Sequence, residues 1–267
     1  MATATLIDPP CEALRVDDHC LEYRWFGTRP PRGPTLVFLH EALGSAPLWR
    51  DVPAALAALT GLPAMAYSRR GFGGSDPRPL PLPVDYLDIE ADRELPAVLD
   101  ALDIAEPILI GHSDGATIAL MHAGSPAGAR VRAVVAEAPH VFVEETTAAG
   151  IREALPVYRG GLREKLARHH GAQTDGVFFG WYDTWLSPEF RGWNVEDRLP
   201  AIACPTLVIQ GLDDQYGTPR QVEAIAAAVT GPVETMLLPG CGHTPHRDRR
   251  EEVLAAIARF VRNLPHG

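Results

Sequence analysis

The feature that most constrains this chain is the run Gly-His-Ser-Asp-Gly at residues 111–115, which directly follows an apolar stretch. Residues 107–110 predict a buried strand, and residues 114–123, rich in small side chains, predict a helix. A turn this short leaves no room for side chains two positions before or after its apex, so glycine is needed there. Ser113 at the apex is then held with its hydroxyl above the edge of a sheet. The helix N-terminus directs N–H groups and partial positive charge toward whatever this hydroxyl attacks.

Strand and helix patterns alternate on both sides of this turn. Strand patterns cover residues 20–26, 35–39, 63–67, 107–110, 131–136, 205–209 and 233–238, and helical patterns cover 48–59, 85–102, 114–123, 219–229 and 248–261. Pro- and Gly-rich stretches at 29–34 and 68–83 predict loops. This alternation predicts an α/β fold, with a mostly parallel twisted sheet and helices on both faces. The strand at 20–26 is expected at an edge.

The alternation breaks between residues 140 and 199. This segment holds helical pieces at 151–155, 162–169 and 175–186, no convincing strand, and three of the five tryptophans. We interpret it as a helical lid over the carboxyl edge of the sheet, where ligands bind in such folds. The alternative is extra packing with no part in the site. The expected division is a core of residues 1–139 and 200–267 and a lid of residues 140–199.

Composition restricts the partners of the chain. Its 267 residues suffice for one large domain with an insertion, and its net charge of −10 leaves no basic surface for nucleic acid or an anionic membrane. The four cysteines do not have the spacing of a metal site. Residues 1–10 show no signal-peptide pattern, and no apolar stretch is long enough to span a bilayer. We expect a reduced cytoplasmic setting and a small-molecule substrate, with a homodimer as one candidate oligomeric state.

Ser113 needs a base within hydrogen-bond reach, and that base needs an orienting acid. In this topology they are expected in the order serine, acid, histidine, each in a loop that follows a strand. Asp213 and Asp214 follow the strand at 205–209, and His243 follows the strand at 233–238 in a glycine-rich loop.

With Gly-His-Ser-Asp-Gly at 111–115, Gly-Leu-Asp-Asp at 211–214 and Gly-Cys-Gly-His at 240–243, the chain resembles the α/β-hydrolase superfamily from about residue 20 onward, apart from the inserted segment. The resemblance implies a cofactor-free serine hydrolase. Ser113 would be the nucleophile, His243 the general base and acid, and Asp214 the orienting acid, because relatives place the acid three residues after the glycine. Asp213 and Glu137 remain alternatives, since some relatives take the acid from the strand after the elbow.

The resemblance also implies an oxyanion hole, whose donors each lower the barrier by roughly 3 kcal/mol. One donor would be the backbone N–H of Asp114, and matching to the family motif gives Ala42 as the other. Relatives commonly carry His-Gly in this loop, whereas this chain has His40 and Glu41. Glu41 is expected either to face the pocket or to point to solvent.

Further pocket residues are expected from their positions. Trp181 and Trp185 lie in the predicted lid, and His140 follows the strand at 131–136, where it either contacts substrate or, as we favour, satisfies a strand-end carbonyl. Residues 246–248 are expected to begin a helix with a solvated face. His243 and His246 have a spacing that metal sites use, but no further ligand cluster supports zinc, so no metal is expected.

The resemblance implies hydrolysis of a carboxylic ester or lactone of a small to medium, mostly apolar substrate through an acyl-enzyme. One alternative is a carbon–carbon bond hydrolase of meta-cleavage-type diketones, or a cofactor-free perhydrolase or lyase with the same triad. Another is a non-catalytic small-molecule receptor. Epoxide hydrolase and haloalkane dehalogenase chemistry is disfavoured, because those relatives carry aspartate where this chain has Ser113.

Overall fold

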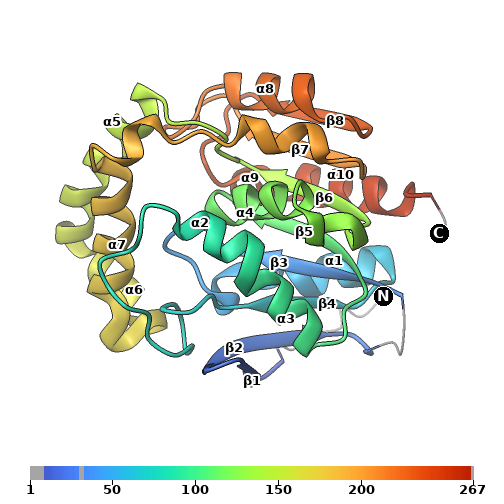
Figure 1. The fold of residues 1–267 in the computed structure, drawn as a ribbon, viewed down its shortest axis with the longest axis horizontal. Helices are drawn as coiled ribbons and strands as arrows, with labels where there is room; N and C mark the ends of the chain where they lie inside the picture. Colours follow the sequence, from blue (N-terminus) through green and yellow to red (C-terminus); the bar gives the residue numbers. More distant parts are fainter. Residues whose placement is uncertain (1–8, 30–32, 266–267) are drawn as a thin grey trace.

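The computed structural model describes residues 9–29 and 33–265 of the chain (Figure 1). In these residues eight strands form one sheet in the order β1-β2-β4-β3-β5-β6-β7-β8. The strands are β1 Glu12–Val16, β2 His19–Phe26, β3 Pro34–Leu39, β4 Ala64–Tyr67, β5 Glu106–His112, β6 Ala133–Glu137, β7 Thr206–Gly211 and β8 Val233–Leu238. Strands β4, β3 and β5 to β8 pair in parallel, and only β1 and β2 at one edge are antiparallel. The mostly parallel sheet is therefore confirmed.

The strand expected at an edge, β2, is instead second in the sheet, because β1 pairs with it on the outside. Strand β1 was not predicted, because Glu12 and Arg15 interrupt its apolar pattern and its residues are largely exposed. Residues 1–8 of the N-terminal stretch and residues 30–32 of the expected loop at 29–34 lie outside the described residues.

Helices cover both faces of the sheet. They are α1 Val52–Thr60, α2 Tyr86–Ile89, α3 Leu95–Ala101, α4 Asp114–Ala123, α5 Glu145–Val157, α6 Arg163–His170, α7 Thr174–Leu186, α8 Arg220–Ala228, α9 Pro245–Asp248 and α10 Arg250–Arg262. The expected helix at 48–59 is divided into a 3-10 turn, Ala46–Trp49, and α1, and that at 85–102 contains a π-helical turn, Glu90–Glu94.

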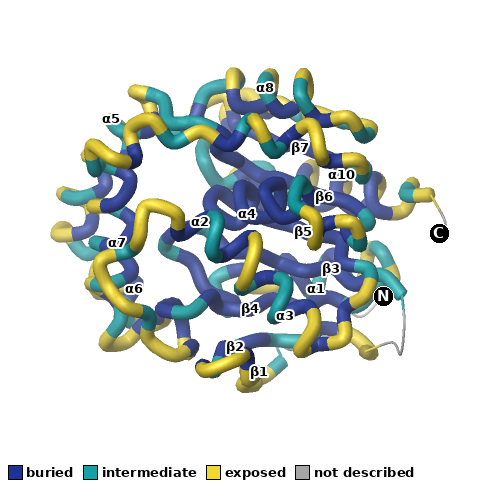
Figure 2. The backbone as a smooth tube through the Cα atoms, in the orientation of Figure 1, coloured by how far each residue is buried: buried dark blue, intermediate teal, exposed yellow. Residues whose placement is uncertain are grey.

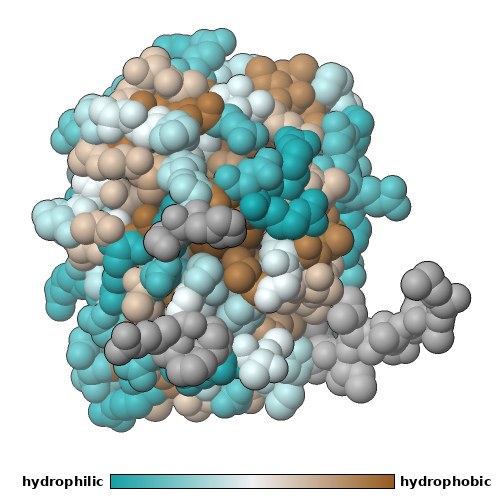
Figure 3. Space-filling view, turned by 90° about the vertical axis from the view of Figure 1, so that its right-hand side faces the viewer, coloured by the Kyte–Doolittle hydropathy of each residue, from teal (hydrophilic) through white to brown (hydrophobic). Residues whose placement is uncertain are grey.

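Alternate residues of each strand point to opposite faces of the sheet, so each strand supplies two cores. In β3, Val37 packs into the core shared with α3, α4 and α8, whereas Phe38 packs into the core shared with α1 and α10. Figure 2 shows the central strands buried between these layers. The side of the molecule away from α5–α7 shows hydrophilic and hydrophobic side chains interspersed (Figure 3).

Helices α5, α6 and α7, which we call the inserted helices, follow β6 and precede β7. They stand together beside the sheet, at the left in Figure 1. An isolated bridge between Phe142 and Asn194 joins the two ends of this segment. No helix in the described part of the chain has the length and apolar composition needed to cross a bilayer. All four cysteines are free.

Candidate active site

Ser113 alone forms the turn between β5 and α4. Its backbone adopts φ 53° and ψ −119°, a conformation that residues other than glycine rarely occupy. Two hydrogen bonds hold it there. The Ser113 N–H donates to the carbonyl of Glu137 at 2.9 Å, and the Thr117 N–H donates to the carbonyl of Ser113 at 3.0 Å. The strained turn thus connects β5 to the start of α4 and is hydrogen-bonded to the neighbouring parallel strand β6.

The glycines on either side of Ser113 are required by close backbone contacts. A Cβ atom at Gly111 would lie 2.2 Å from the carbonyl oxygen of Gly115, and one at Gly115 would lie 2.0 Å from the carbonyl oxygen of Leu39. Neither backbone could accommodate a side chain without moving β3 or α4. The structure bears out the steric reason for this motif.

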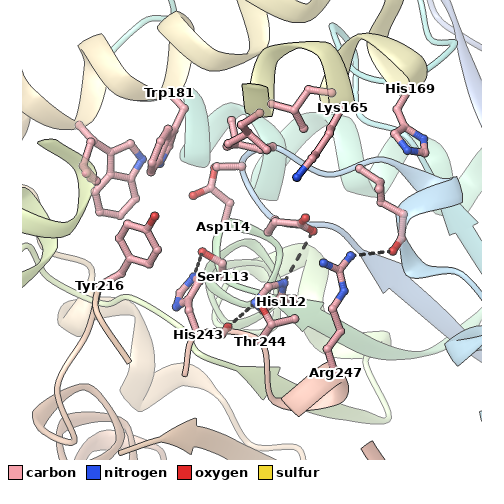
Figure 4. Close-up of a pocket in the computed structure, with 18 of the residues that line it drawn as sticks. His112, Ser113, Asp114, Lys165, His169, Trp181, Tyr216, His243, Thr244 and Arg247 are labelled. Carbon is pink, nitrogen blue, oxygen red and sulfur yellow. Dashed lines mark hydrogen bonds and ion pairs between the residues drawn. The ribbon is translucent and has the colours of Figure 1, made fainter. Parts of the chain in front are cut away.

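Ser113, His243 and Asp214 form a continuous hydrogen-bonded chain (Figure 4). The Ser113 Oγ lies 2.9 Å from His243 Nε2, and His243 Nδ1 lies 2.8 and 2.9 Å from the two carboxylate oxygens of Asp214. A proton on Nδ1 can donate only to the carboxylate, which leaves Nε2 to accept the serine proton. The arrangement can therefore move a proton away from the Ser113 hydroxyl.

The groups around Asp214 hold its carboxylate in place and keep it ionised. Its carboxylate accepts the backbone N–H of Tyr216 at 2.8 Å and the side-chain amide of Gln210 at 2.7 Å. Burial alone would raise the pKa of Asp214, but the hydrogen bonds from His243 and Tyr216 outweigh it and lower the pKa. The carboxylate therefore remains ionised beside His243.

The two alternative acids do not contact the His243 ring in the described structure. The Asp213 side chain is exposed. Glu137 is fully buried at the end of β6, where its carboxylate accepts the backbone N–H of His246 at 3.1 Å and lies 3.0 Å from His246 Nδ1. The expected solvated face at 246–248 is thus wrong for His246, which is 4% exposed because the buried Glu137 carboxylate needs a partner.

The loop after β3 is fixed by a buried arginine. The Arg69 guanidinium donates to the backbone carbonyls of His40 at 3.3 Å and Glu41 at 3.1 Å. The backbone N–H of Arg69 donates to His40 Nε2 at 3.0 Å. Ala42, the next residue, lines the cavity above Ser113. This loop and the start of α4 therefore face the same space from two sides.

Glu41 faces the pocket, which was one of its two expected orientations. Its carboxylate lies 3.6 Å from His112 Nδ1, and His112 Nε2 lies 2.7 Å from the carbonyl of His243. Although burial opposes both shifts, the facing charges lower the pKa of Glu41 and raise that of His112. The two side chains form an ion pair that also supports the His243 loop.

His140 lies close to the catalytic candidates and remains neutral. Its ring centroid is 5.9 Å from that of His243, and its Nε2 lies 3.1 Å from the carbonyl of Tyr216. Burial, then the neighbouring His243, lowers the pKa of His140 to about 4. It lines the cavity and also satisfies a carbonyl, although that carbonyl belongs to a loop and not to a strand end.

A cavity of about 470 Å³ opens above Ser113 and His243. Trp181 and Tyr216 line one side of it, and Lys165, His169 and Arg247 line the other (Figure 4). Trp185 also lines the cavity, with its ring 5.3 Å from that of His140. The two tryptophans were expected from the sequence, whereas Tyr216 and the cations were not. The signal for Tyr216 was its position two residues after Asp214, whereas nothing in the helical pattern of 162–169 separated Lys165 from a solvated lysine.

No group of three or more His, Cys, Asp or Glu side chains in the described residues is placed to hold a metal ion.

Comparison with known proteins agrees with this fold. The model of a family described as the alpha/beta hydrolase family matches residues 36–256. The chain is 25% identical to epoxide hydrolase A of Mycobacterium tuberculosis, over 96% of this chain and 98% of that protein. One similar solved structure is the enol-lactonase from Burkholderia xenovorans, with a TM-score of 0.71 and 19% identity over 94% of this chain and 99% of that one. Another is the proline iminopeptidase of Mycobacterium smegmatis, with a TM-score of 0.68 and 22% identity over 94% of this chain and 97% of that one.

Proposed function

The chain belongs to the alpha/beta hydrolase family, an enzyme family of the hydrolase class, and from this premise we propose that it is a serine hydrolase acting on a carboxylic ester or lactone. The observation that carries the proposal is the unbroken hydrogen-bonded chain from Asp214 through His243 to Ser113, with distances of 2.8 and 2.9 Å. A serine hydroxyl with such a base is suited to attack a carbonyl carbon.

In the proposed reaction, Ser113 Oγ attacks the carbonyl carbon while its proton passes to His243 Nε2. The tetrahedral intermediate then expels the alcohol, which takes the proton from His243 and leaves an acyl group on Ser113. A water molecule, activated by the same His243, releases the acid. Asp214 stays ionised and stabilises the imidazolium that forms in each half of the reaction.

The oxyanion of each tetrahedral intermediate needs donors placed before the reaction. We assign this role to the backbone N–H groups of Asp114 and Ala42. Asp114 begins α4, where N–H groups lack intrahelical partners and the helix dipole is positive. Arg69 supports the assignment of Ala42, because it fixes the carbonyls of the two preceding residues.

We assign the inserted helices the role of a lid. Trp181 and Trp185 on α7 and Leu166 on α6 line the cavity together with Tyr216. A cavity of about 470 Å³ with this aromatic wall fits a small to medium apolar group on one side of the scissile bond.

Epoxide opening, the activity named for one relative, does not suit Ser113. A serine that attacked an epoxide carbon would be left as an alkyl ether, and ethers are not cleaved by water under these conditions. Attack on an ester or lactone instead gives an acyl-enzyme that His243 can hydrolyse.

The proposal is tested by turnover of a panel of 4-nitrophenyl esters, simple lactones and a coloured vinylogous diketone. We expect hydrolysis of an ester or lactone, with kcat reduced at least about 10³-fold in Ser113→Ala. Ser125→Ala is the matched control, because Ser125 lies beyond α4 and does not line the cavity. Turnover that persists unchanged in Ser113→Ala would overturn the proposal, and a diketone cleaved faster than every ester would reassign the bond that is broken.

A further inference from the structure

The lining of the cavity includes several exposed cations. Arg50, Lys165, Arg168 and Arg247, which we call the basic wall, all line the cavity. They come from three separate parts of the chain: Arg50 follows the 3-10 turn before α1, Lys165 and Arg168 lie one turn apart on α6, and Arg247 lies on α9. In Figure 4 Lys165 and Arg247 extend into the cavity from opposite sides.

No carboxylate in the described residues forms an ion pair with any of these four cations. Asp51, next to Arg50, pairs with Arg250 at 2.7 Å, and on α6 it is Arg163 that pairs with Asp175, also at 2.7 Å. Arg247 donates only to the carbonyl of Leu48, at 3.3 Å. The basic wall therefore carries uncompensated positive charge.

The two carboxylates that line the cavity do not cancel this charge. Glu41 is paired with His112, as described above. Asp114 accepts a hydrogen bond from the Tyr86 hydroxyl at 2.8 Å and lies 3.7 Å from the buried Arg69. The basic wall also affects the neighbouring His169 ring. Burial and then the charge of Arg50 lower the pKa of His169.

Positive charge gathered in a cleft raises the local concentration of anions, even though this chain has a net charge of −10. A neutral ester has no net charge, so these four cations would attract it far less than an anionic ester. We propose that the substrate carries a carboxylate, which the basic wall binds while its apolar part lies against Trp181, Trp185 and Tyr216. This inference rests on the proposed ester or lactone hydrolysis and specifies its substrate class.

The proposal is tested first by binding, so that catalysis is not required. In Ser113→Ala protein, calorimetry compares monophenyl adipate with its uncharged analogue, in which a carboxamide replaces the carboxylate. We expect the carboxylate to bind about fivefold more tightly in about 50 mM NaCl, and the difference to shrink in about 500 mM NaCl as the charges are screened.

Variants locate the effect. Lys165→Gln combined with Arg168→Gln should bring the two affinities within about twofold, because half of the basic wall loses its charge. Arg159→Gln combined with Arg191→Gln makes the same charge change in the inserted segment outside the cavity lining and should leave the preference intact. Equal affinity for the two ligands, including failure of both to bind, would overturn the inference, as would a preference that survives loss of Lys165 and Arg168.

Turnover of the same two esters by the protein with Ser113 intact separates this inference from the proposed function. We expect a higher kcat/KM for the carboxylate ester, with the loss in Lys165→Gln/Arg168→Gln confined mainly to KM. Equal kcat/KM for the two esters would contradict the inference while leaving ester hydrolysis in place. Preferential binding without turnover would contradict the proposed function and leave the binding site in place.

Discussion

Two buried carboxylates lie at the ends of neighbouring strands close to His243, and only one of them contacts its ring. Asp214 follows β7 and binds His243 Nδ1 with both oxygens, whereas Glu137 ends β6 and binds His246. The residue pattern alone could not separate them, because both follow the serine in a parallel sheet and either could reach the histidine loop. Only the resemblance to the family favoured Asp214. The difference arises from the three-residue step between His243 and His246, which directs each imidazole to its own carboxylate.

We predict different consequences for removing each charge. Asp214→Asn should lower kcat by about 10³- to 10⁴-fold, because the imidazole loses its orienting acid and its favoured tautomer. Glu137→Gln should keep kcat within about tenfold and lower the free energy of unfolding by about 1–3 kcal/mol, because His246 loses a buried charged partner. Steady-state kinetics and urea unfolding of both variants measure these effects. Full stability with abolished activity in Glu137→Gln would contradict this assignment.

The order and types of the triad residues were predictable because each residue directly follows a strand whose apolar pattern is clear. The environment of Glu41 was not predictable in the same way. Its partner His112 lies at the end of β5, and the two meet because Leu39 pairs with Gly111 across parallel strands. Such a contact depends on strand order and register, which the local sequence of either residue does not encode.

At the scale of secondary-structure elements, one hydrogen-bonded chain joins the inserted helices to the elbow helix. The Trp185 indole on α7 donates to the Tyr86 hydroxyl on α2 at 2.8 Å, and that hydroxyl donates to the Asp114 carboxylate on α4 at 2.8 Å. Tyr86 is 1% exposed, so its hydroxyl cannot exchange these partners for water. The chain fixes α7 relative to the residue that follows Ser113.

We predict that Tyr86→Phe lowers the free energy of unfolding by about 1–3 kcal/mol, because it leaves the Trp185 N–H and one Asp114 oxygen without a partner. A double-mutant cycle of Tyr86→Phe with Trp185→Phe, followed by chemical denaturation, should give a coupling energy of about 1 kcal/mol. Tyr182→Phe on the same helix is the control, because the Tyr182 hydroxyl has no hydrogen-bond partner in the described part of the chain. Strictly additive losses for Tyr86 and Trp185 would show that the contact does not couple the elements.

Helical periodicity predicted that the inserted segment contains helices, and α5, α6 and α7 fall where those patterns lie. It did not predict the π-helical turn at Glu90–Glu94 within the expected helix at 85–102. Glu90 there is 1% exposed and pairs with Arg78 at 3.1 Å. The partner Arg78 lies outside this helix, so no pattern within 85–102 reveals the contact.

At the scale of the whole molecule, several histidines are buried in neutral form. Burial lowers the pKa of four of them: His40, His122, His140 and His170. Each of these rings hydrogen-bonds to a backbone group, as His170 does to the Gly73 N–H and the Leu43 carbonyl, which ties α6 to the core. Protonation of such a ring is possible only at a cost to the folded state.

Stability should therefore fall as the medium becomes more acidic. Below an unfolded-state pKa near 6.5 the unfolded chain binds protons that these four rings in the folded chain do not. We predict that the free energy of unfolding decreases by at least about 2 kcal/mol between about pH 7 and pH 5. His112 offsets part of this loss, because despite its burial Glu41 raises its pKa. Urea midpoints across this range measure the effect, and a stability that rises toward pH 5 would contradict it.

The class of the fold was predictable from alternation alone, because buried parallel strands read as continuous apolar runs. The position of the chain's uncompensated charge was not. Arg50, Lys165, Arg168 and Arg247 are ordinary surface cations in the sequence, and only folding brings them to one cavity. Net charge gives the opposite impression, since the whole chain is acidic.

Activation of Ser113 by His243 can be measured by labelling with a fluorophosphonate followed by intact-protein mass spectrometry. We predict one adduct per chain in the unmodified protein and in Ser125→Ala, none in Ser113→Ala, and strongly slowed labelling in His243→Ala. A folded, unmodified protein that takes up no label, or an adduct that persists in Ser113→Ala, would contradict it.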